Sequence, residues 1–291
     1  MRALLRSLLL ASVAATTAAA QRDTTFTWSK RLGDGGRLTI RNINGPIDVR
    51  AASGDRAEVR ATVRAEYRGN ARDVDFDVRE HSSTDVEICT VYQGRSVCDR
   101  DHSWNNIRVR VTYVVELPKS MRLRVETGNG EVSIVQTVGD VDATSGNGDV
   151  TIKESTGRVT ASSGNGDVII TSAQGPVRTS TGNGRVEVTA AKGPVEASTG
   201  NGDILVKMGS LPADAAPMVF STGSGNVRVT LPGDFNGEID ASTGNGSVDS
   251  DFEVRLTGRL NSSHMRGTIG NGNGPLIKLR SGNGRLVLRK G

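Results

Sequence analysis

The sequence has few aromatic residues and little net charge. Aromatic residues are 3% of the 291-residue chain, which is too few for a globular core built from aromatic side chains. Without Arg2 and Arg6, which belong to the first twenty residues, the 36 Lys and Arg fall to 34 against 32 Asp and Glu. A chain this close to neutrality is not typical of nucleic-acid-binding proteins, and we expect no nucleic-acid partner.

Long apolar runs are also scarce, and the one candidate lies at the start of the chain. Residues 1–20 combine Arg2 and Arg6 with a short apolar run at Leu8–Leu10 and the small residues Ala18–Ala20 before Gln21. This is the pattern of a secretory signal peptide, and the run is too short and too rich in Ala and Thr for a membrane anchor. We expect an exported chain, in the periplasm or at the cell surface, whose mature form has no membrane span.

The chain has two cysteines, Cys89 and Cys98. Two thiols make a poor zinc site, and the Cys-x-x-Cys spacing of a redox pair is absent. In an oxidising compartment we expect a disulfide that closes a short loop. Both cysteines lie in residues 70–106, which break the surrounding pattern and are predicted to project from the scaffold. His81 and His102 lie there too, but their spacing matches no metal motif, so we interpret them as solvated loop residues.

Glycine at a fixed period is the most prominent feature. From Gly139 to Gly202 glycine recurs every nine residues, and a β-branched residue follows two positions after each glycine. Alternate blocks differ, because one kind carries Ser/Thr-Gly-Asn-Gly and the other a plainer turn such as Thr156-Gly157. The repeat is therefore 18 residues long, with two strands and two turns, and such internal repeats indicate a stacked architecture.

Within each repeat, apolar and polar residues alternate with a period of two, which indicates half-buried strands. Stacking places residues one repeat apart in ladders, so Val150, Val168 and Val186 are predicted to share one sheet and face a dry interior. A ladder of small residues, which includes Ala143 and Thr179, indicates that the interior is narrow. The sequence therefore predicts an all-β fold, a single parallel β-solenoid with 18-residue coils, and general chirality favours a right-handed β-helix.

The Gly-Asn-Gly turns are predicted to be structural. Glycine supplies the positive φ that a tight turn needs, and stacked asparagine amides can hydrogen-bond along the axis of the solenoid. The predicted turn ladder consists of Asn129, Asn147, Asn165, Asn183, Asn201, Asn245, Asn271 and Asn283.

Three parts of the chain are predicted. Residues 1–20 are the signal peptide, residues 21–127 are N-terminal capping strands with the Cys89–Cys98 loop insertion, and residues 128–291 are coils that are regular at first and then looser. End units of a repeat protein must differ from the rest to remain soluble. We therefore interpret residues 38–65 as degenerate opening coils and Leu286–Leu288 as part of a closing coil.

Two kinds of chemistry fit the repeat less well. A nine-residue period with Gly and Asp resembles a calcium-binding β-roll, but Arg185 occupies the position that Asp149 and Asp167 hold in their repeats. A polysaccharide-cleaving β-helix needs clustered carboxylates on one face, whereas acids such as Asp142 and Glu196 are interspersed with Arg and Thr. We predict no metal, no cofactor and no catalytic residue, with a carbohydrate-active enzyme as an alternative.

The outward residues form a regular polar array that includes Thr144, Thr160, Arg178 and Lys207. Such an array suits weak, multivalent contact with glycans or other proteins, or it only keeps the solenoid from aggregating. Arginines near the N-terminal end could meet anionic envelope glycolipid or polysaccharide, or could be solvated beside glutamates; they are Arg56, Arg60, Arg64, Arg108, Arg110, Arg122 and Arg124.

Several motifs resemble those of the bacterial putative adhesin family of exported β-solenoid domains. They are Asn42–Val49, Val114–Lys119 and the serial Ser/Thr-Gly-Asn-Gly-Asp-Val turns, and the resemblance covers most of residues 38–289. It implies a right-handed parallel β-helix, a cell-envelope location and no catalytic residues, although the Cys89–Cys98 insertion departs from the family pattern. We therefore predict a non-enzymatic, exported, adhesin-like binding module, with a purely structural envelope scaffold as a further alternative.

Overall fold

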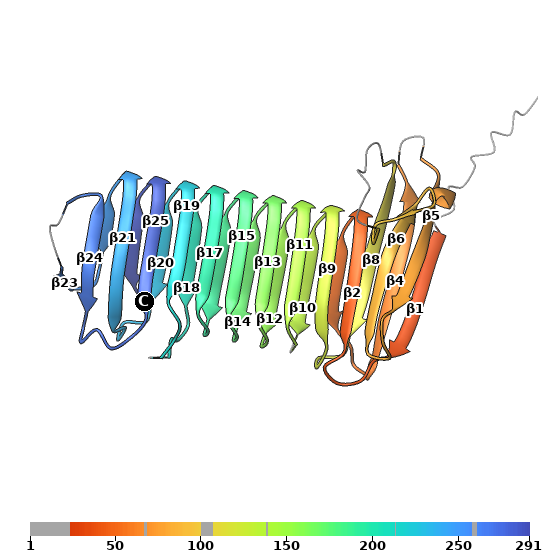
Figure 1. Ribbon diagram of the computed structural model, residues 1–291, viewed down its shortest axis with the longest axis horizontal. Helices are drawn as coiled ribbons and strands as arrows, with labels where there is room; N and C mark the ends of the chain where they lie inside the picture. Colours follow the sequence, from red (N-terminus) through yellow and green to blue (C-terminus); the bar gives the residue numbers. More distant parts are fainter. Residues whose placement is uncertain (1–23, 67–68, 100–106, 138, 213, 258–260) are drawn as a thin grey trace, which may run out of the picture.

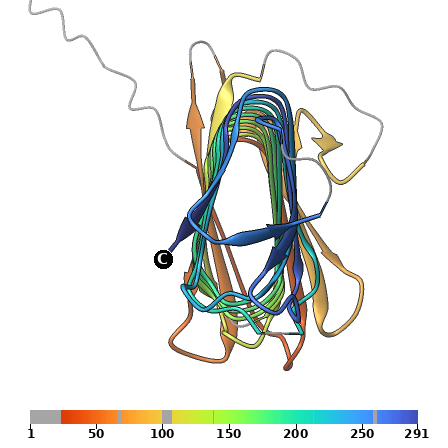
Figure 2. The ribbon, with the colours of Figure 1, turned by 90° about the vertical axis from the view of Figure 1, so that its left-hand side faces the viewer.

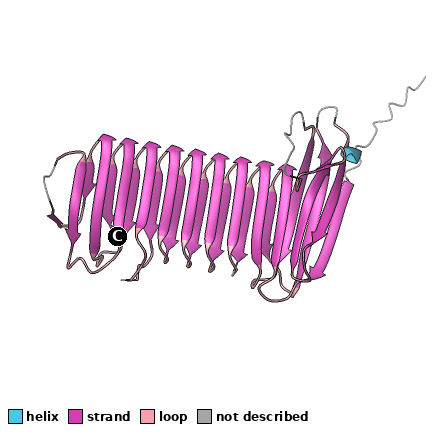
Figure 3. Cartoon of the chain, viewed as in Figure 1, coloured by secondary structure: helices cyan, strands magenta, loops and turns pink. Residues whose placement is uncertain are grey.

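The chain forms an elongated column in which two long β-sheets face each other (Figures 1 and 2). The computed structural model describes residues 24–66, 69–99, 107–137, 139–212, 214–257 and 261–291. Residues 1–20, predicted to be the signal peptide, lie outside this part, as does His102. Almost all regular structure in the described residues is strand, and one short 3-10 helix, η1 (Ala71–Asp73), interrupts it (Figure 3).

Sheet A has twelve strands. From the N-terminal end of the column they are β1 (Thr24–Arg31), β4 (Arg56–Ala65), β8 (Val109–Leu117), β3 (Ile47–Ala51), β10 (Val132–Thr137), β12 (Val150–Ser155), β14 (Val168–Ala173), β16 (Val186–Ala191), β18 (Ile204–Met208), β20 (Val227–Leu231), β26 (Leu286–Lys290) and β22 (Val248–Ser250).

Sheet B has fourteen strands. From the same end, the main path is β5 (Val74–Glu80), β6 (Asp85–Tyr92), β2 (Arg37–Asn44), β9 (Arg122–Asn129), β11 (Val141–Asn147), β13 (Val159–Asn165), β15 (Val177–Asn183), β17 (Val195–Asn201), β19 (Met218–Ser224), β25 (Leu276–Asn283), β21 (Gly237–Asn245), β24 (His264–Ile269) and β23 (Val254–Leu256), while β7 (Arg95–Ser96) pairs with β6 off this path.

Each regular coil consists of one strand of sheet B, a glycine turn and one strand of sheet A. The predicted ladder of Val150, Val168 and Val186 is confirmed, because these residues pair in register on β12, β14 and β16 and are fully buried. A single coil cannot bury its apolar face, but a stack of coils buries one continuous column of side chains. Each Val or Ile in that column contributes about 1.5–3 kcal/mol of transfer free energy.

The small-residue ladder lies inside sheet B, where Ala143, Ala161, Thr179 and Ala197 pair in register. All four are buried, as predicted for a narrow interior. Thr179 is the odd member, because its buried hydroxyl has no hydrogen-bond partner. A buried hydroxyl without a partner costs about 1–3 kcal/mol in proteins, so the ladder carries a local defect at this coil.

The turns bring neighbouring coils very close together. An ideal Cβ built at Gly164 would lie 2.4 Å from the carbonyl oxygen of Gly146, one coil earlier. At Gly166 the backbone has φ +148, which L side chains rarely adopt. The two glycines of each Gly-Asn-Gly turn are therefore needed for different reasons. The first allows the close approach of the neighbouring coil, and the second allows the conformation of the turn.

The order of coils at the two ends differs from the order in the sequence. The C-terminal strands β25 and β26 lie between β19/β20 and β21/β22. The prediction that Leu286–Leu288 belong to a closing coil is therefore wrong, because β22, β23 and β24 lie beyond them at the end of the column. At the other end, β2 and β3 are likewise covered by strands that follow them in the chain (Figure 1).

Residues 70–106 are predicted to project from the scaffold, but the described part of this segment belongs to sheet B. In the described part of this segment, β6 pairs in parallel with β2 and β5 pairs antiparallel with β6. These strands extend sheet B because their inward residues, such as Val86 and Ile88, are buried in the same core as the coils. The segment is therefore part of the N-terminal cap.

The described aromatic residues are confined to the two ends. Between Tyr113 and Phe220 the sequence has no Phe, Trp or Tyr, and this stretch forms the regular coils. At the N-terminal end Phe26 stacks on Phe76 with ring centroids 4.4 Å apart. At the C-terminal end Phe235 and Phe252 meet edge to face at 6.1 Å. Large rings thus close a column whose middle is too narrow to hold them.

Candidate binding surface

The predicted turn ladder exists in the regular coils. Each asparagine amide donates to the side-chain oxygen of the asparagine one coil earlier, at 2.8–2.9 Å. Ser224 takes the next position, and the ladder resumes beyond it where Asn245 donates to Asn283 at 2.7 Å. The bonded members are Asn129, Asn147, Asn165, Asn183, Asn201, Asn245 and Asn283.

Asn271 is not a member of this ladder, and its prediction as one is wrong. Its Gly-Asn-Gly motif lies between β24 and β25, where the chain leaves an antiparallel strand rather than a coil. The flanking Gly270 and Gly272 have φ +62 and +78, far from +148 at Gly166. The Asn271 side chain accepts from the backbone of Asn273 at 3.0 Å, which is a local turn contact.

The aspartates after the Gly-Asn-Gly turns also have a structural role. Asp149 Oδ1 accepts the backbone N–H of Asp167 at 2.8 Å, and Asp167 Oδ1 accepts that of Arg185 at 2.7 Å. Asp203 does the same for Asn226 at 2.7 Å. These carboxylates bond backbone donors of the next coil, which accounts for the Gly-Asp pattern that resembled a calcium-binding repeat.

The outer face of sheet B carries a straight row of hydroxyl groups, which we call the hydroxyl row. Thr144 Oγ1 lies 3.2 Å from Ser162 Oγ on the next coil. Ion pairs join neighbouring coils on the same face, for example Arg178 with Glu196 at 2.5 Å. Neighbours thus satisfy many of the polar groups on this face. The members of the row are Thr144, Ser162, Ser180, Ser198 and Ser221.

The outer face of sheet A differs, because three arginines surround a groove of about 820 Å³. We call it the arginine groove. Leu205, Arg228 and Val287 pair in register along its floor. Arg185 and Arg285 come from the turns that precede β16 and β26, and both line the groove. The outward position that Leu205 and Val287 occupy is held by Thr151, Ile169 and Glu187 in the preceding coils.

The three guanidinium groups differ in how far they are already engaged. Arg285 Nε lies 2.7 Å from Asp249, and this hydrogen bond holds the pKa of the Asp249 carboxyl below its usual value. Arg185 makes longer contacts, 3.3 Å to Asp167 and 4.0 Å to Glu187. Arg228 is exposed and makes no ion pair with any described residue. It is the arginine in the groove that is most available to a ligand.

The seven arginines singled out near the N-terminal end do not form one patch. Arg56, Arg60 and Arg64 lie on β4 and Arg110 on β8, in sheet A. Arg108 directly precedes β8. Arg64 and Arg110 face each other across the pair of strands.

The remaining two, Arg122 and Arg124, lie on β9 in sheet B. The hydrogen bond that Arg124 donates to Glu126 raises the pKa of its guanidinium. Spacing in the sequence could not show this separation, because the two groups lie on opposite sheets.

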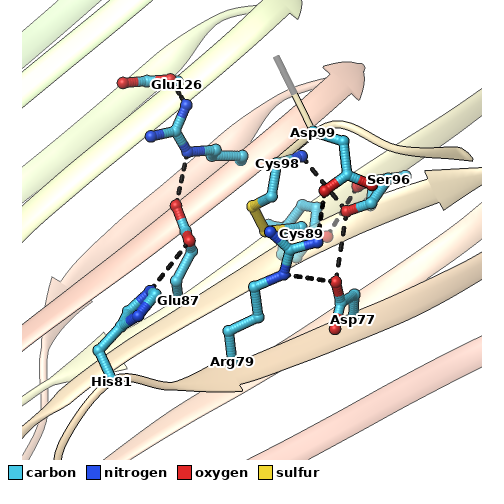
Figure 4. The surroundings of a disulfide bond; sticks show 12 residues. Asp77, Arg79, His81, Glu87, Cys89, Ser96, Cys98, Asp99 and Glu126 are labelled. Carbon is cyan, nitrogen blue, oxygen red and sulfur yellow. Dashed lines mark hydrogen bonds and ion pairs between the residues drawn. A yellow bond between two sulfur atoms is a disulfide. The ribbon is translucent and has the colours of Figure 1, made fainter. Parts of the chain in front are cut away.

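The cysteines lie on the outer face of the cap, and the structure joins Cys89 to Cys98 in a disulfide (Figure 4). Beside it, the Arg79 guanidinium donates hydrogen bonds to Asp99 and Asp77, and these bonds raise its pKa. Glu87 and the two sulfurs form a compact group in the described residues, but sulfurs in a disulfide are not thiolate ligands. Glu87 instead bonds Arg41 at 2.7 Å.

His81 extends this network, because its Nε2 lies 3.2 Å from Glu87 (Figure 4). More than half of the His81 side chain is exposed, in agreement with its interpretation as a solvated residue. The cap is therefore braced by a disulfide and by ion pairs rather than arranged around a reactive group.

Sequence reasoning missed the arginine groove. Its residues come from four coils, and one of these is the C-terminal coil that inserts beside β20. Leu205 and Val287 are apolar at positions where alternation predicts polar residues, but Ile169 is too and lies outside the groove, so this signal could not have located it.

The chain is similar to known proteins in both sequence and fold. The family model described as Toastrack DUF4097 matches residues 35–284. A putative adhesin from Bacteroides fragilis is similar in structure, with a TM-score of 0.46, 14% identity, and 92% of this chain and 97% of that chain covered. A putative adhesin from Parabacteroides distasonis has a TM-score of 0.45 and 10% identity, with 91% and 97% covered. No curated protein matches the sequence. No helix among the described residues could cross a membrane.

Proposed function

This chain belongs to the Toastrack DUF4097 family, and we propose that it is a non-enzymatic, adhesin-like binding module of the cell envelope. The observation that carries the proposal is the arginine groove on sheet A, where the free guanidinium group of Arg228 lies beside the partly exposed Leu205. The ligand class that fits is an acidic polysaccharide. Its carboxylates would pair with arginine, and its sugar rings would pack on the partly exposed Leu205.

Arginine suits this role because its planar guanidinium donates two parallel hydrogen bonds to a carboxylate. Arg228 is central in the groove, since its strand β20 lies between β18 and β26. Arg185 and Arg285 flank it, and their present acidic partners can be exchanged for a ligand carboxylate at modest cost because exposed ion pairs contribute little.

The repeated outer faces support weak contacts at many points. The coils place similar outward side chains about 4.7–4.9 Å apart along the axis, and a long polymer can touch several of them at once. Linked weak contacts raise the overall affinity by effective concentration. The hydroxyl row on sheet B is a second, weaker surface for such contacts.

The test compares two exposed arginines that lie on different sheets. Arg228→Ala removes the free guanidinium of the groove, whereas Arg178→Ala removes an arginine of the hydroxyl-row face. We expect the wild type to bind acidic polysaccharides on a glycan array. Arg228→Ala should weaken that binding about 10-fold or more, since a hydrogen bond to a charged group contributes about 1.5–3 kcal/mol, and Arg178→Ala should leave it nearly unchanged.

Equal effects of the two substitutions, or no binding to any acidic polysaccharide, would contradict the proposed site. Release of reducing ends from a bound polysaccharide would favour a carbohydrate-active enzyme instead. Binding to no glycan at all would favour a purely structural scaffold.

We further propose that the chain is exported after cleavage before Gln21, and that its coils are right-handed with a regular length of 18 residues. Mass spectrometry of the protein recovered from a bacterial periplasm should give a mature chain that begins at Gln21. An uncleaved N-terminus would contradict export by this signal.

A further inference from the structure

The N-terminal end of the column is uneven. Beyond the coil formed by β2 and β3, sheet A adds three strands, β8, β4 and β1, whereas the main path of sheet B adds only β6 and β5. Within the described residues, β1 therefore pairs only with β4, and it faces sheet B through β5 alone, where Phe26 stacks on Phe76. Figure 1 shows β1 as the last strand at this end of the ribbon.

The free edge of β1 has few of the devices that usually protect an edge strand. Natural edges are short, charged, interrupted by proline or covered. At the opposite end of the column the edge strands β22 and β23 have three residues each. The strand β1 has eight residues, TTFTWSKR, with no proline or glycine, and charge only at its last two positions. This edge is suited to pairing with another strand.

The inner side of β1 is also incompletely covered. Phe26 and Trp28 pair in register with the buried Ala61 and Val59 of β4, so they face the interior of the column. Both remain partly exposed, as does Phe76, on which Phe26 stacks. The missing strand position in sheet B thus leaves an aromatic surface at the end of the molecule.

We propose that this end binds a second copy of the chain, end to end, with β1 of each copy pairing alongside β5 of the other. Such an arrangement has two-fold symmetry and fills the missing strand position in both copies. Sheet A of one copy would continue into sheet B of the other, and the exposed aromatic side chains of both would be buried between them. Closed pairs of this kind are the commonest form of homo-oligomer.

Direction and charge both favour the pairing of β1 with β5. The two strands run in the same direction, because Phe26 stacks on Phe76 and Lys30 pairs with Glu80 at 2.7 Å. Rotation about an axis parallel to the strands keeps that direction, so β1 and the second copy's β5 would form a parallel pair. The strand β1 carries two basic residues and no acidic one, whereas β5 carries three acidic residues and one arginine. Lys30 and Arg31 already pair with Glu80 and Asp55 of the same chain, and Asp77 pairs with Arg79. The charge preference for β5 therefore comes from exchange of these solvent-accessible pairs, which are individually weak.

Pairing of β1 with the second copy's β1 is less favourable. It would bring together two basic strands and would leave the missing position of sheet B unfilled. The dimer with β1 beside β5 would present two arginine grooves at the far ends of one double-length column. This would increase avidity for a long polymer, although the proposed dimer does not depend on what the groove binds.

The experiment introduces a negative or a positive charge at the exposed residue Thr27. Thr27 points outward from β1, beside Arg60 of its own chain. Thr27→Glu places a carboxylate next to the acidic side chains of the second copy's β5, whereas Thr27→Lys places an ammonium group there. Molar mass is measured by light scattering during size-exclusion chromatography over a range of concentrations. Thr160→Glu, an outward substitution in the middle of sheet B, serves as the control.

We expect the wild type, Thr27→Lys and Thr160→Glu to have twice the mass of one chain. Thr27→Glu should dissociate at least about 10-fold more readily, as like charges at an interface disfavour association. Asp75→Lys in the same chain should restore the dimer. A monomeric wild type, or a Thr27→Glu variant that dimerises as well as the control, would overturn the proposal. Dissociation of both Thr27 variants would overturn the β5 partner and favour pairing of β1 with β1.

Discussion

Replacement of Asn165 by aspartate tests the asparagine ladder at its centre. The Asn165 amide donates to Asn147 Oδ1 at 2.8 Å, and its oxygen accepts from Asn183 Nδ2 at 2.8 Å. Aspartate has nearly the same shape but cannot donate when it is ionised. The substitution therefore keeps the bond from Asn183 and turns the bond to Asn147 into a contact between two oxygen atoms.

The expected loss can be worked out from these contacts. One hydrogen bond contributes about 0.5–1.5 kcal/mol net, and the opposed oxygens add repulsion that solvent partly screens because the turn is exposed. We therefore expect Asn165→Asp to lower the free energy of unfolding by about 1–2 kcal/mol. Each kcal/mol corresponds to a fall in Tm of roughly 2–4 °C in a domain of this size.

Asn271→Asp is the matched control, because Asn271 has the same Gly-Asn-Gly context but lies outside the ladder. Its side-chain oxygen accepts from the Asn273 backbone, and a carboxylate can still accept there. Thermal unfolding followed by circular dichroism at pH 7 should show the loss of stability in Asn165→Asp and little change in Asn271→Asp.

The pH dependence gives a second test. The introduced carboxyl at position 165 is disfavoured when ionised, so its pKa in the folded protein should lie above the unfolded value of about 3.9. The penalty is then complete above the folded pKa and disappears as the pH falls below the unfolded pKa, because the protonated carboxyl can donate. Equal stability of the two variants at pH 7, or a difference that persists unchanged at pH 3, would refute the ladder as a stabilising contact.

Three further outcomes are expected. Thr179→Val should raise the free energy of unfolding by about 1 kcal/mol in urea titrations, because it removes a buried hydroxyl without a partner; destabilisation would contradict this. Gly164→Ala should cost about 2–4 kcal/mol through overpacking and lost coil contacts, whereas Gly54→Ala, which has open space around it, should cost little. The bond from Arg280 lowers the pKa of Asp240, so the stability from this pair is present above pH 4 and lost as the pH falls through the folded pKa. Asp240→Asn should therefore lower Tm at pH 7 and have a smaller effect at pH 2.

Turn chemistry shows where sequence reasoning was sufficient and where it was not. The asparagine ladder of the regular coils could be predicted, since each member has the same neighbours one repeat away. The same motif misled at Asn271, because Gly-Asn-Gly also forms a local turn after an antiparallel strand. A motif identifies the conformations that the chain can adopt, and the coils above and below decide which of them is stabilised.

One corner that recurs in the coils could not be recognised from the residue types in the sequence. Gln136, Glu154, Ser172 and Ala190 all adopt left-handed backbone conformations, with φ between 54 and 61. Glycine or asparagine normally signals this conformation, yet none of the four is either residue. The register of the coils imposes the corner, so local propensity did not reveal it.

The sequence alone determined which residues face inward in the regular coils, because alternation and an 18-residue period assign their ladders without reference to the rest of the molecule. It also determined where coils approach closely, through the glycines of the turns. Only the tertiary structure decided which coil lies on which. Coils with the same ladder can stack in any order, so the insertion of β25 beside β19 and of β26 beside β20 depends on long-range packing. That insertion places Arg285 and Val287 beside Arg228 and thereby creates the groove on which the proposed function depends.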